Sequence, residues 1–196
     1  MPLDLSNAKE AVIYFTHEIQ PETMDGLLDA VSECVNEGVQ QLNLLISSPG
    51  GTVNEAISAY HILRGLPIRI ITHNVGCVAS SAITLFCCGD LRKSVPHGSF
   101  MFHAYNTVLP EGMMERSDLE RVSRSIANDE RQGHEILVAN SNLQLAQVKA
   151  MHRQESAYLT PEEAMAIDFI HEISPVSIPA GTPLIGVAPT GAGFMH

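Results

Sequence analysis

Runs of apolar and β-branched residues alternate with segments of helical periodicity over the first part of the chain. Four runs have the composition of β-strands: Ala11–Thr16, Leu42–Ser47, Ile68–Thr72 and Ser99–His103. Three segments between them have apolar residues at helical spacing and predict helices: Pro21–Asn36, Val53–Arg64 and Ser80 to about Cys88. Strands that alternate with helices are typical of an α/β fold, so we expect that fold class here.

The pattern changes after His103, where a loop leads into a highly charged segment that predicts a helix from about Arg116 to Ala139. The apolar stripe of this segment is narrower than that of a core helix and consists mainly of Leu119, Val122 and Ile126. We expect this helix either to project and pack against another surface, or to be a solvated helix that carries salt bridges.

The C-terminal part contains one well-marked helix start and a tail. Thr160, Pro161 and Glu163 have the spacing of a capping box with proline at the first helical position, so a helix is predicted to begin there. The segment Ser174–His196 is rich in Pro and Gly and has no apolar periodicity, which predicts a loose or partner-dependent tail. We therefore expect a single domain over residues 1–173 and a tail over residues 174–196.

Composition argues against several classes of function. The 22 acidic residues outnumber the 11 basic ones, and the net charge of −11 opposes binding to nucleic acid or to anionic membranes. The first residues do not resemble a secretory signal, and the most apolar window, Val75–Gly89, is shorter than the ~20 residues that span a bilayer, so we expect a cytoplasmic protein. The four cysteines form no C-x-x-C pair and have no histidine at ligand spacing, which predicts neither a metal site nor a disulfide framework.

Three segments place glycine or polar residues where a predicted strand ends. The segment Ile46–Gly51 ends in paired glycines, which can aim backbone N–H groups into a cavity but which also occur at such turns for steric reasons. Ser80 lies at the start of an apolar helix, where free N–H groups stabilise negative charge, so it is either a nucleophile or a helix cap. His103 follows an apolar strand and is either a general base or a structural histidine. We assign no catalytic role to the other eight histidines.

In combination, these motifs resemble those of the proteolytic subunit of Clp protease. That family carries approximately N-S-P-G-G, then G-x-A-A-S-M-G, then M-I-H-Q. This chain carries S-S-P-G-G, G-C-V-A-S-S-A and M-F-H-A in the same order, and the resemblance runs from about Val12 to Ile173. It implies the ClpP/crotonase-like fold, an α/β stack of β-β-α units with a projecting helical handle at about residues 104–141.

The resemblance also implies a chemistry, that of a serine endopeptidase. Ser80 would be the nucleophile and His103 the general base, and the backbone N–H groups of Gly51 and Ser81 would form the oxyanion hole. Such a site hydrolyses peptide bonds through an acyl-enzyme and uses no cofactor and no metal. The implied partners are peptide or unfolded protein substrates and further copies of the chain in a homo-oligomeric ring.

The chain departs from the family at the third member of the triad and at two other points. Alignment puts Ser156 where the family has Asp, so we name the adjacent carboxylate, Glu155, as the candidate third member; a backbone carbonyl or the Ser156 hydroxyl is the alternative partner for the imidazole. Only about ten residues precede the first predicted strand, so an unfoldase ATPase is left out of the expected partners. Pro110 removes a donor from the segment that pairs with substrate in the family, so we expect an altered substrate groove.

These residues and the resemblance leave three alternative hypotheses for the function. The first is a Clp-type serine peptidase that acts through Ser80. The second is a non-catalytic ring subunit that has kept the fold and lost hydrolysis, which the missing Asp suggests. The third is a crotonase-like acyl-coenzyme A enzyme, in which two backbone N–H groups stabilise an enolate and Ser80 and His103 share no role.

Overall fold

One mixed sheet forms the centre of the computed structural model, which describes residues 5, 8–109, 112–153 and 156–187. The strands described are β1 (Glu10–Phe15), β2 (Gln41–Ser48), β3 (Arg69–Ala79), β4 (Leu91–Ser94), β5 (Ser99–Phe102), β6 (Ala157–Leu159), β7 (Glu172–Ile173) and β8 (Leu184–Gly186). Their order is β6-β5-β3-β2-β1-β8, with β4 paired to β3 and β7 paired to β4. Within the described ranges every pair is parallel except β5 with β6.

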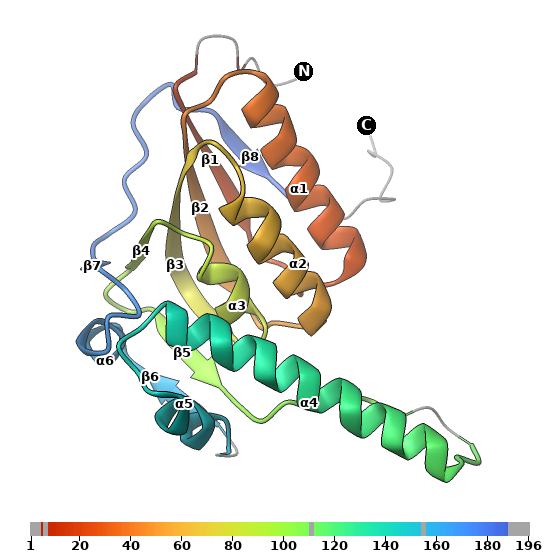
Figure 1. Cartoon of the computed structure of the whole chain (residues 1–196). Helices are drawn as coiled ribbons and strands as arrows, with labels where there is room; N and C mark the ends of the chain where they lie inside the picture. The colour runs from red at the N-terminus through yellow and green to blue at the C-terminus, as the bar shows by residue number, and fades with distance from the viewer. Residues whose placement is uncertain (1–4, 6–7, 110–111, 154–155, 188–196) are drawn as a thin grey trace.

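Helices cover one face of this sheet. The helices described are α1 (Pro21–Asn36), α2 (Val53–Arg64), α3 (Ala82–Phe86), α4 (Arg116–Ala139), α5 (Leu145–His152) and α6 (Pro161–Ala166). Figure 1 shows α1, α2 and α3 side by side in front of the strands. The sequence accounts for this layer, because Leu42 and Leu44 of β2 alternate with partly exposed residues and join Leu27 and Val31 of α1 in one apolar core. This mixed α/β architecture is the predicted fold class.

Strand β3 positions the candidate site, because the sheet divides along it. Its first half pairs with β4 and its second half, Cys77–Ala79, pairs with β5. The buried side chain of Asn74 lies at the division, where its amide donates to the Ser99 carbonyl (2.9 Å) and its oxygen accepts from the Gly76 N–H (3.0 Å). Strands β3 and β5 therefore end side by side, and the residues that follow each of them come together.

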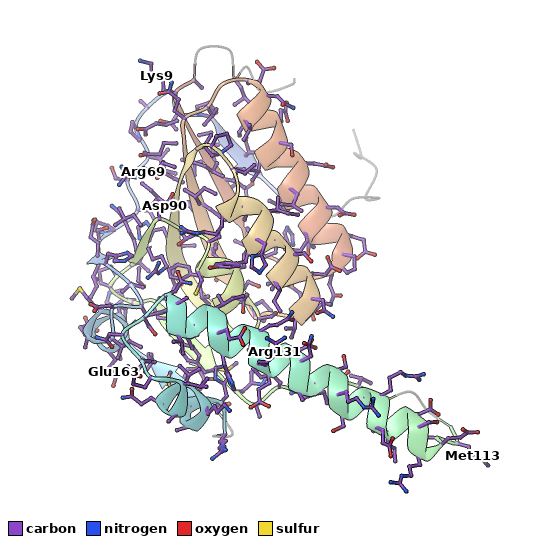
Figure 2. The ribbon with its side chains drawn as sticks, in the orientation of Figure 1. Lys9, Arg69, Asp90, Met113, Arg131 and Glu163 are labelled. Carbon is purple, nitrogen blue, oxygen red and sulfur yellow. The ribbon has the colours of Figure 1, made fainter. Side chains whose placement is uncertain are left out.

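Helix α4 extends away from the rest of the molecule (Figure 1). Its buried residues are confined to its C-terminal part, where Gly133, His134, Ile136 and Leu137 pack against the body. Figure 2 shows side chains around its outer part, between Arg131 and Met113 near the tip. Ion pairs such as Arg131–Glu135 (3.0 Å) run along it. The helix thus both projects and carries surface salt bridges, which combines the two alternatives predicted for this segment.

The buried side chain of Arg92 in β4 ties the base of α4 to the sheet. Its guanidinium donates to the carbonyl oxygens of Phe169 (2.7 Å) and Asn140 (2.9 Å). It makes longer bonds, each of 3.3 Å, to the Gly89 and Asp168 carbonyls and to the Asn140 side chain. Within the described ranges Arg92 forms no ion pair with a carboxylate, so carbonyl dipoles from three segments compensate its charge.

Several sequence predictions are confirmed and others need correction. Thr160 accepts a hydrogen bond from the Glu163 N–H and begins α6, as predicted. The helix predicted from Ser80 begins only at Ala82, and β3 continues to Ala79 instead of ending at Thr72. Strand β4 and helix α5 were not predicted.

The C-terminal segment is more ordered than its composition predicts. Residues 184–186 form β8, which pairs in parallel with β1, so this part of the expected loose tail belongs to the sheet. The division into a domain of residues 1–173 and a tail remains a prediction. Pro110 lies outside the described residues. Among the helices that the structure describes, none is both long enough and apolar enough to cross a membrane.

Candidate functional site

Ser80 occupies a tight turn between β3 and α3. Its φ is 56°, a left-handed value that, apart from glycines, only Asp168 shares in the described part of the chain. Such a conformation costs a non-glycine residue about 1–3 kcal/mol, and residues that adopt it cluster at functional sites. The turn is held by the Ser80 N–H, which donates to the Met101 carbonyl of β5 (2.9 Å). Strand β3 ends at Ala79 and the N-cap of α3 is Ser81, so Ser80 is neither the last residue of a strand nor a helix cap.

His103 follows β5 directly and contacts Ser80. Its Nε2 lies 2.7 Å from the Ser80 Oγ, and its Nδ1 lies 2.7 Å from the carbonyl oxygen of Ala104. A carbonyl can only accept, so Nδ1 carries the proton of the neutral ring and Nε2 is left to accept from the serine hydroxyl. This is the tautomer that a general base needs.

The paired glycines close the other side of the site. Gly50 (φ 93°) and Gly51 (φ 145°) have conformations that other residues rarely adopt. A Cβ on Gly50 would lie 2.6 Å from the Ser80 Cβ, so only glycine allows the two turns to approach this closely. The Ser81 hydroxyl donates to the Gly51 carbonyl (3.1 Å) and joins the turns.

Two backbone donors beside Ser80 remain available. Neither the Gly51 N–H nor the Ser81 N–H donates to a residue that the structure describes, in contrast to the neighbouring N–H groups of Gly50, Thr52 and Ser80. Gly51, Ser81, Ser80 and His103 line one small cavity of about 50 Å³. Free amides that line a cavity beside a hydroxyl can stabilise an anion that forms there.

Of the predicted site residues, Glu155 lies outside the described part of the chain. The strand that follows it, β6, pairs Ala157 with Phe102 of β5 in antiparallel register. Ser156 thus directly precedes Ala157, the first residue of β6, which pairs with β5. In the described residues, the contact made by Nδ1 of His103 is the one to the Ala104 carbonyl, which is the backbone alternative that the sequence left open.

Sequence reasoning missed three side chains around this cavity. His152 of α5 and Tyr105 line it, and their rings stack with centroids 5.4 Å apart. His134 of α4 is fully buried against both rings, at 4.8 Å from His152 and 5.8 Å from Tyr105. No periodicity or motif connects these residues, which come together only through the packing of α4 and α5 against the segment after His103.

Burial keeps these two histidines neutral. Burial lowers the pKa of His134 to about 4, assisted by the neighbouring His152, and neither of its ring nitrogens has a hydrogen-bond partner among the described residues. Burial also lowers the pKa of His152, whose Nδ1 donates to the Val148 carbonyl (2.9 Å). The wall of the cavity behind His103 is therefore uncharged at neutral pH.

The described residues contain no group of three or more His, Cys, Asp or Glu side chains that could hold a metal ion. All four cysteines are free, and burial raises the pKa of Cys34 to about 11 and that of Cys87 to about 12, so these thiols are poor nucleophiles. The arrangement that remains consists of a hydroxyl, an imidazole in hydrogen-bond contact with it and two free amides, which are the components of acyl transfer.

Comparison with known proteins identifies a family and a relative of this chain. The model of the family described as Clp protease matches residues 5–176. A protein of Carsonella ruddii (strain PV), named ATP-dependent Clp protease proteolytic subunit, is 30% identical over 145 residues, which cover 71% of this chain and 72% of the relative.

Proposed function

Because the chain belongs to the Clp protease family, we propose that it is a serine peptidase that cuts peptide bonds through an acyl-enzyme on Ser80. The observation that carries this proposal is the 2.7 Å contact between the Ser80 Oγ and the His103 Nε2. The contact favours a peptidase over a crotonase-like thioester enzyme, because that chemistry would leave the paired hydroxyl and imidazole without a shared role.

The proposed reaction uses His103 twice. In acylation the Ser80 Oγ attacks the substrate carbonyl carbon while Nε2 takes the hydroxyl proton, and the resulting oxyanion accepts hydrogen bonds from the Gly51 and Ser81 N–H groups. The imidazolium then gives its proton to the leaving amine, and the C–N bond breaks. In deacylation Nε2 takes a proton from water, whose oxygen attacks the acyl carbon, and the same proton returns to Ser80 as the ester bond breaks.

The Ala104 carbonyl supports this cycle in place of a carboxylate. In serine proteases, replacement of the triad Asp by its amide lowers the rate ~10⁴-fold, because the ring adopts the wrong tautomer. Here the acceptor on Nδ1 is a carbonyl, which holds the correct tautomer without a negative charge. We propose that this arrangement retains orientation of the ring and loses only part of the stabilisation of the imidazolium.

Turnover of a fluorogenic peptide tests the proposal. Ser80→Ala is expected to lower kcat by more than ~1,000-fold, because the attacking atom is removed. Ser58→Ala, at an exposed position of α2, is the matched control and should retain full activity. Turnover that survives in the Ser80→Ala protein would contradict the proposal.

A non-catalytic ring subunit is the second candidate, and one observation favours it: no described carboxylate contacts His103. The same assay separates the two candidates. If the purified chain is inactive alone and candidate partner subunits gain activity when it is added, the second candidate holds. If the chain turns over peptide alone and loses this activity with Ser80→Ala, the first holds.

We propose a homo-oligomeric ring in the cytoplasm as the working form, with peptides or unfolded proteins as substrates. Family membership supports this assembly, and so do the apolar side chains at the start of the projecting segment, where Val108 is 94% exposed and Leu119 is 50% exposed. Molar mass measured by light scattering tests it. The relative is named an ATP-dependent protease, but ATP dependence is not part of our proposal for this chain.

A further inference from the structure

A second cavity adjoins the one that holds Ser80 and His103. It has a volume of about 250 Å³ and shares Val53, Tyr105 and Asn106 with the first. It lies between the start of α2, the segment after His103 and one side of α4. Its volume is below that of pockets for drug-sized ligands, ~300–1,000 Å³, so it suits one long side chain.

The walls of this cavity contain both apolar and polar side chains, and one of its lining residues is a carboxylate. Val122 and Ile126 of α4 form apolar wall together with Val53. One turn further along α4, Asp129 lines the same cavity, and it is the only described lining residue that is charged at neutral pH. The combination of an apolar wall and a terminal carboxylate matches the aliphatic stem and charged head of a Lys or Arg side chain.

Asp129 differs from three other carboxylates of α4 because it is not paired with an arginine among the described residues. Asp118, Glu120 and Glu135 form ion pairs with arginines of the same helix. Asp129 forms no ion pair and no side-chain hydrogen bond with a described residue, although it is half-buried. Burial raises the pKa of Asp129, because removal of the charged carboxylate from water costs free energy.

The negative potential extends to the boundary between the two cavities. Tyr105 lines both of them, and its ring packs so closely on α4 that a Cβ at Gly133 would overlap its hydroxyl. Burial raises the pKa of this phenol, and the negative charges of Glu130 and Asp129 raise it further. A cation placed beside Tyr105 would therefore be stabilised by carboxylates of α4.

We propose that this cavity receives the side chain of the substrate residue whose carbonyl Ser80 attacks, and that Asp129 selects Lys or Arg at that position. The inference rests on the proposed peptidase function, because Ser80 and the free amides define where that carbonyl lies. The residue that carries the carbonyl is then the one whose side chain is nearest to the adjoining cavity. A single carboxylate in such a pocket sets a basic specificity in serine proteases.

The test compares peptides that differ only at the residue before the scissile bond. Fluorogenic peptides with Lys, Arg, Leu or Glu at that position are given to the wild-type chain, and kcat/KM for Lys and Arg should exceed that for Leu at least ~10-fold. Asp129→Asn should lower kcat/KM for Lys and Arg ~10- to 100-fold and change that for Leu less than ~2-fold. Glu135→Gln, on the same helix but outside this cavity, should leave all four values unchanged. Equal cleavage of Lys and Leu peptides by the wild type, or an unchanged ratio in Asp129→Asn, overturns the inference.

A binding measurement separates this inference from the proposed function. Fluorescence anisotropy with the Ser80→Ala chain, which cannot form an acyl-enzyme, compares product-like peptides that end in Lys or in Leu. The Lys peptide should bind at least ~10-fold more tightly, and Asp129→Asn in the same background should remove the difference. If the wild type cleaves no peptide but this difference is present, the proposed function fails and the cavity assignment stands. If the difference is absent, the cavity assignment fails whatever the activity.

Discussion

Nδ1 of His103 lies 2.7 Å from the carbonyl oxygen of Ala104, the next residue in the chain. The imidazole is thus oriented by the backbone of its own segment, and its other nitrogen faces Ser80 at 2.7 Å. A carbonyl fixes the tautomer but cannot carry the negative charge that a triad carboxylate contributes. The site is therefore a serine–histidine pair whose geometry is set by the main chain.

The first prediction concerns Glu155, the carboxylate that the sequence puts forward as the third triad member. If the Ala104 carbonyl orients His103, Glu155→Gln should leave kcat/KM for a fluorogenic peptide within ~2-fold of the wild type. The melting temperature of the variant serves as the control for folding. A loss of ~100-fold or more in a folded variant would assign the third position to Glu155 instead.

The second prediction concerns the stability of the junction between α4 and the sheet. Arg92→Met leaves the carbonyls of Phe169 and Asn140 without their buried donor, so the free energy of unfolding should fall by about 3 kcal/mol. Arg64→Met is the matched control, because Arg64 pairs with Asp90 at the surface and should contribute less than ~1 kcal/mol. Urea denaturation at neutral pH measures both. Equal losses in the two variants would show that the buried guanidinium has no special role.

The third prediction concerns acid stability. The pKa of His134 falls from 6.5 to about 4 on folding, because of burial and the neighbouring His152. Below pH 6.5 the unfolded chain therefore binds a proton that the native chain does not, and stability is lost as the pH falls from 6.5 towards 4. Among the groups that act on the pKa of His134, Glu130, 3.9 Å away on α4, favours the charged form, and Lys149 and His152 of α5 oppose it.

Removal of His134 should flatten this part of the stability curve. Between pH 7 and pH 4 the free energy of unfolding, measured by urea denaturation, should fall for the wild type and fall less for His134→Leu. The difference between the two decreases should reach up to ~3 kcal/mol. His97→Leu, at an exposed position, should follow the wild-type curve. Identical pH profiles for His134→Leu and the wild type would contradict the assignment of a neutral buried imidazole.

The parts of the fold that the sequence predicted are those with a strong local signal. The strands around Val12 and Leu44 are rich in apolar residues, and the helix at Pro161 has a complete capping box. The extension of β3 was missed because Asn74 and Gly76 interrupt its apolar pattern, although both are needed where the sheet divides. Tertiary packing, which no local pattern encodes, made this segment a strand.

Other elements were missed because their local signal is weak. Helix α5 buries only Val148, so it lacks an apolar face. Strand β8 is three residues long and depends on β1 for its hydrogen bonds. In the candidate site, the motifs predicted the neighbourhood of Ser80 and His103, whereas His152 and Asp129 come near it only through the placement of α4 and α5. Their positions depend on tertiary packing between segments that are distant in the sequence, and the spacing of residues in one sequence does not reveal this packing.

Covalent labelling of the hydroxyl tests the central claim most directly. A fluorophosphonate probe reacts with an activated serine, so the wild-type chain should gain one adduct by intact mass, and peptide mapping should place it on Ser80. His103→Ala should abolish labelling because the base is removed, as should Ser80→Ala, while Ser58→Ala should label like the wild type. An adduct that persists in the Ser80→Ala chain, or no adduct on the folded wild type, would contradict the account.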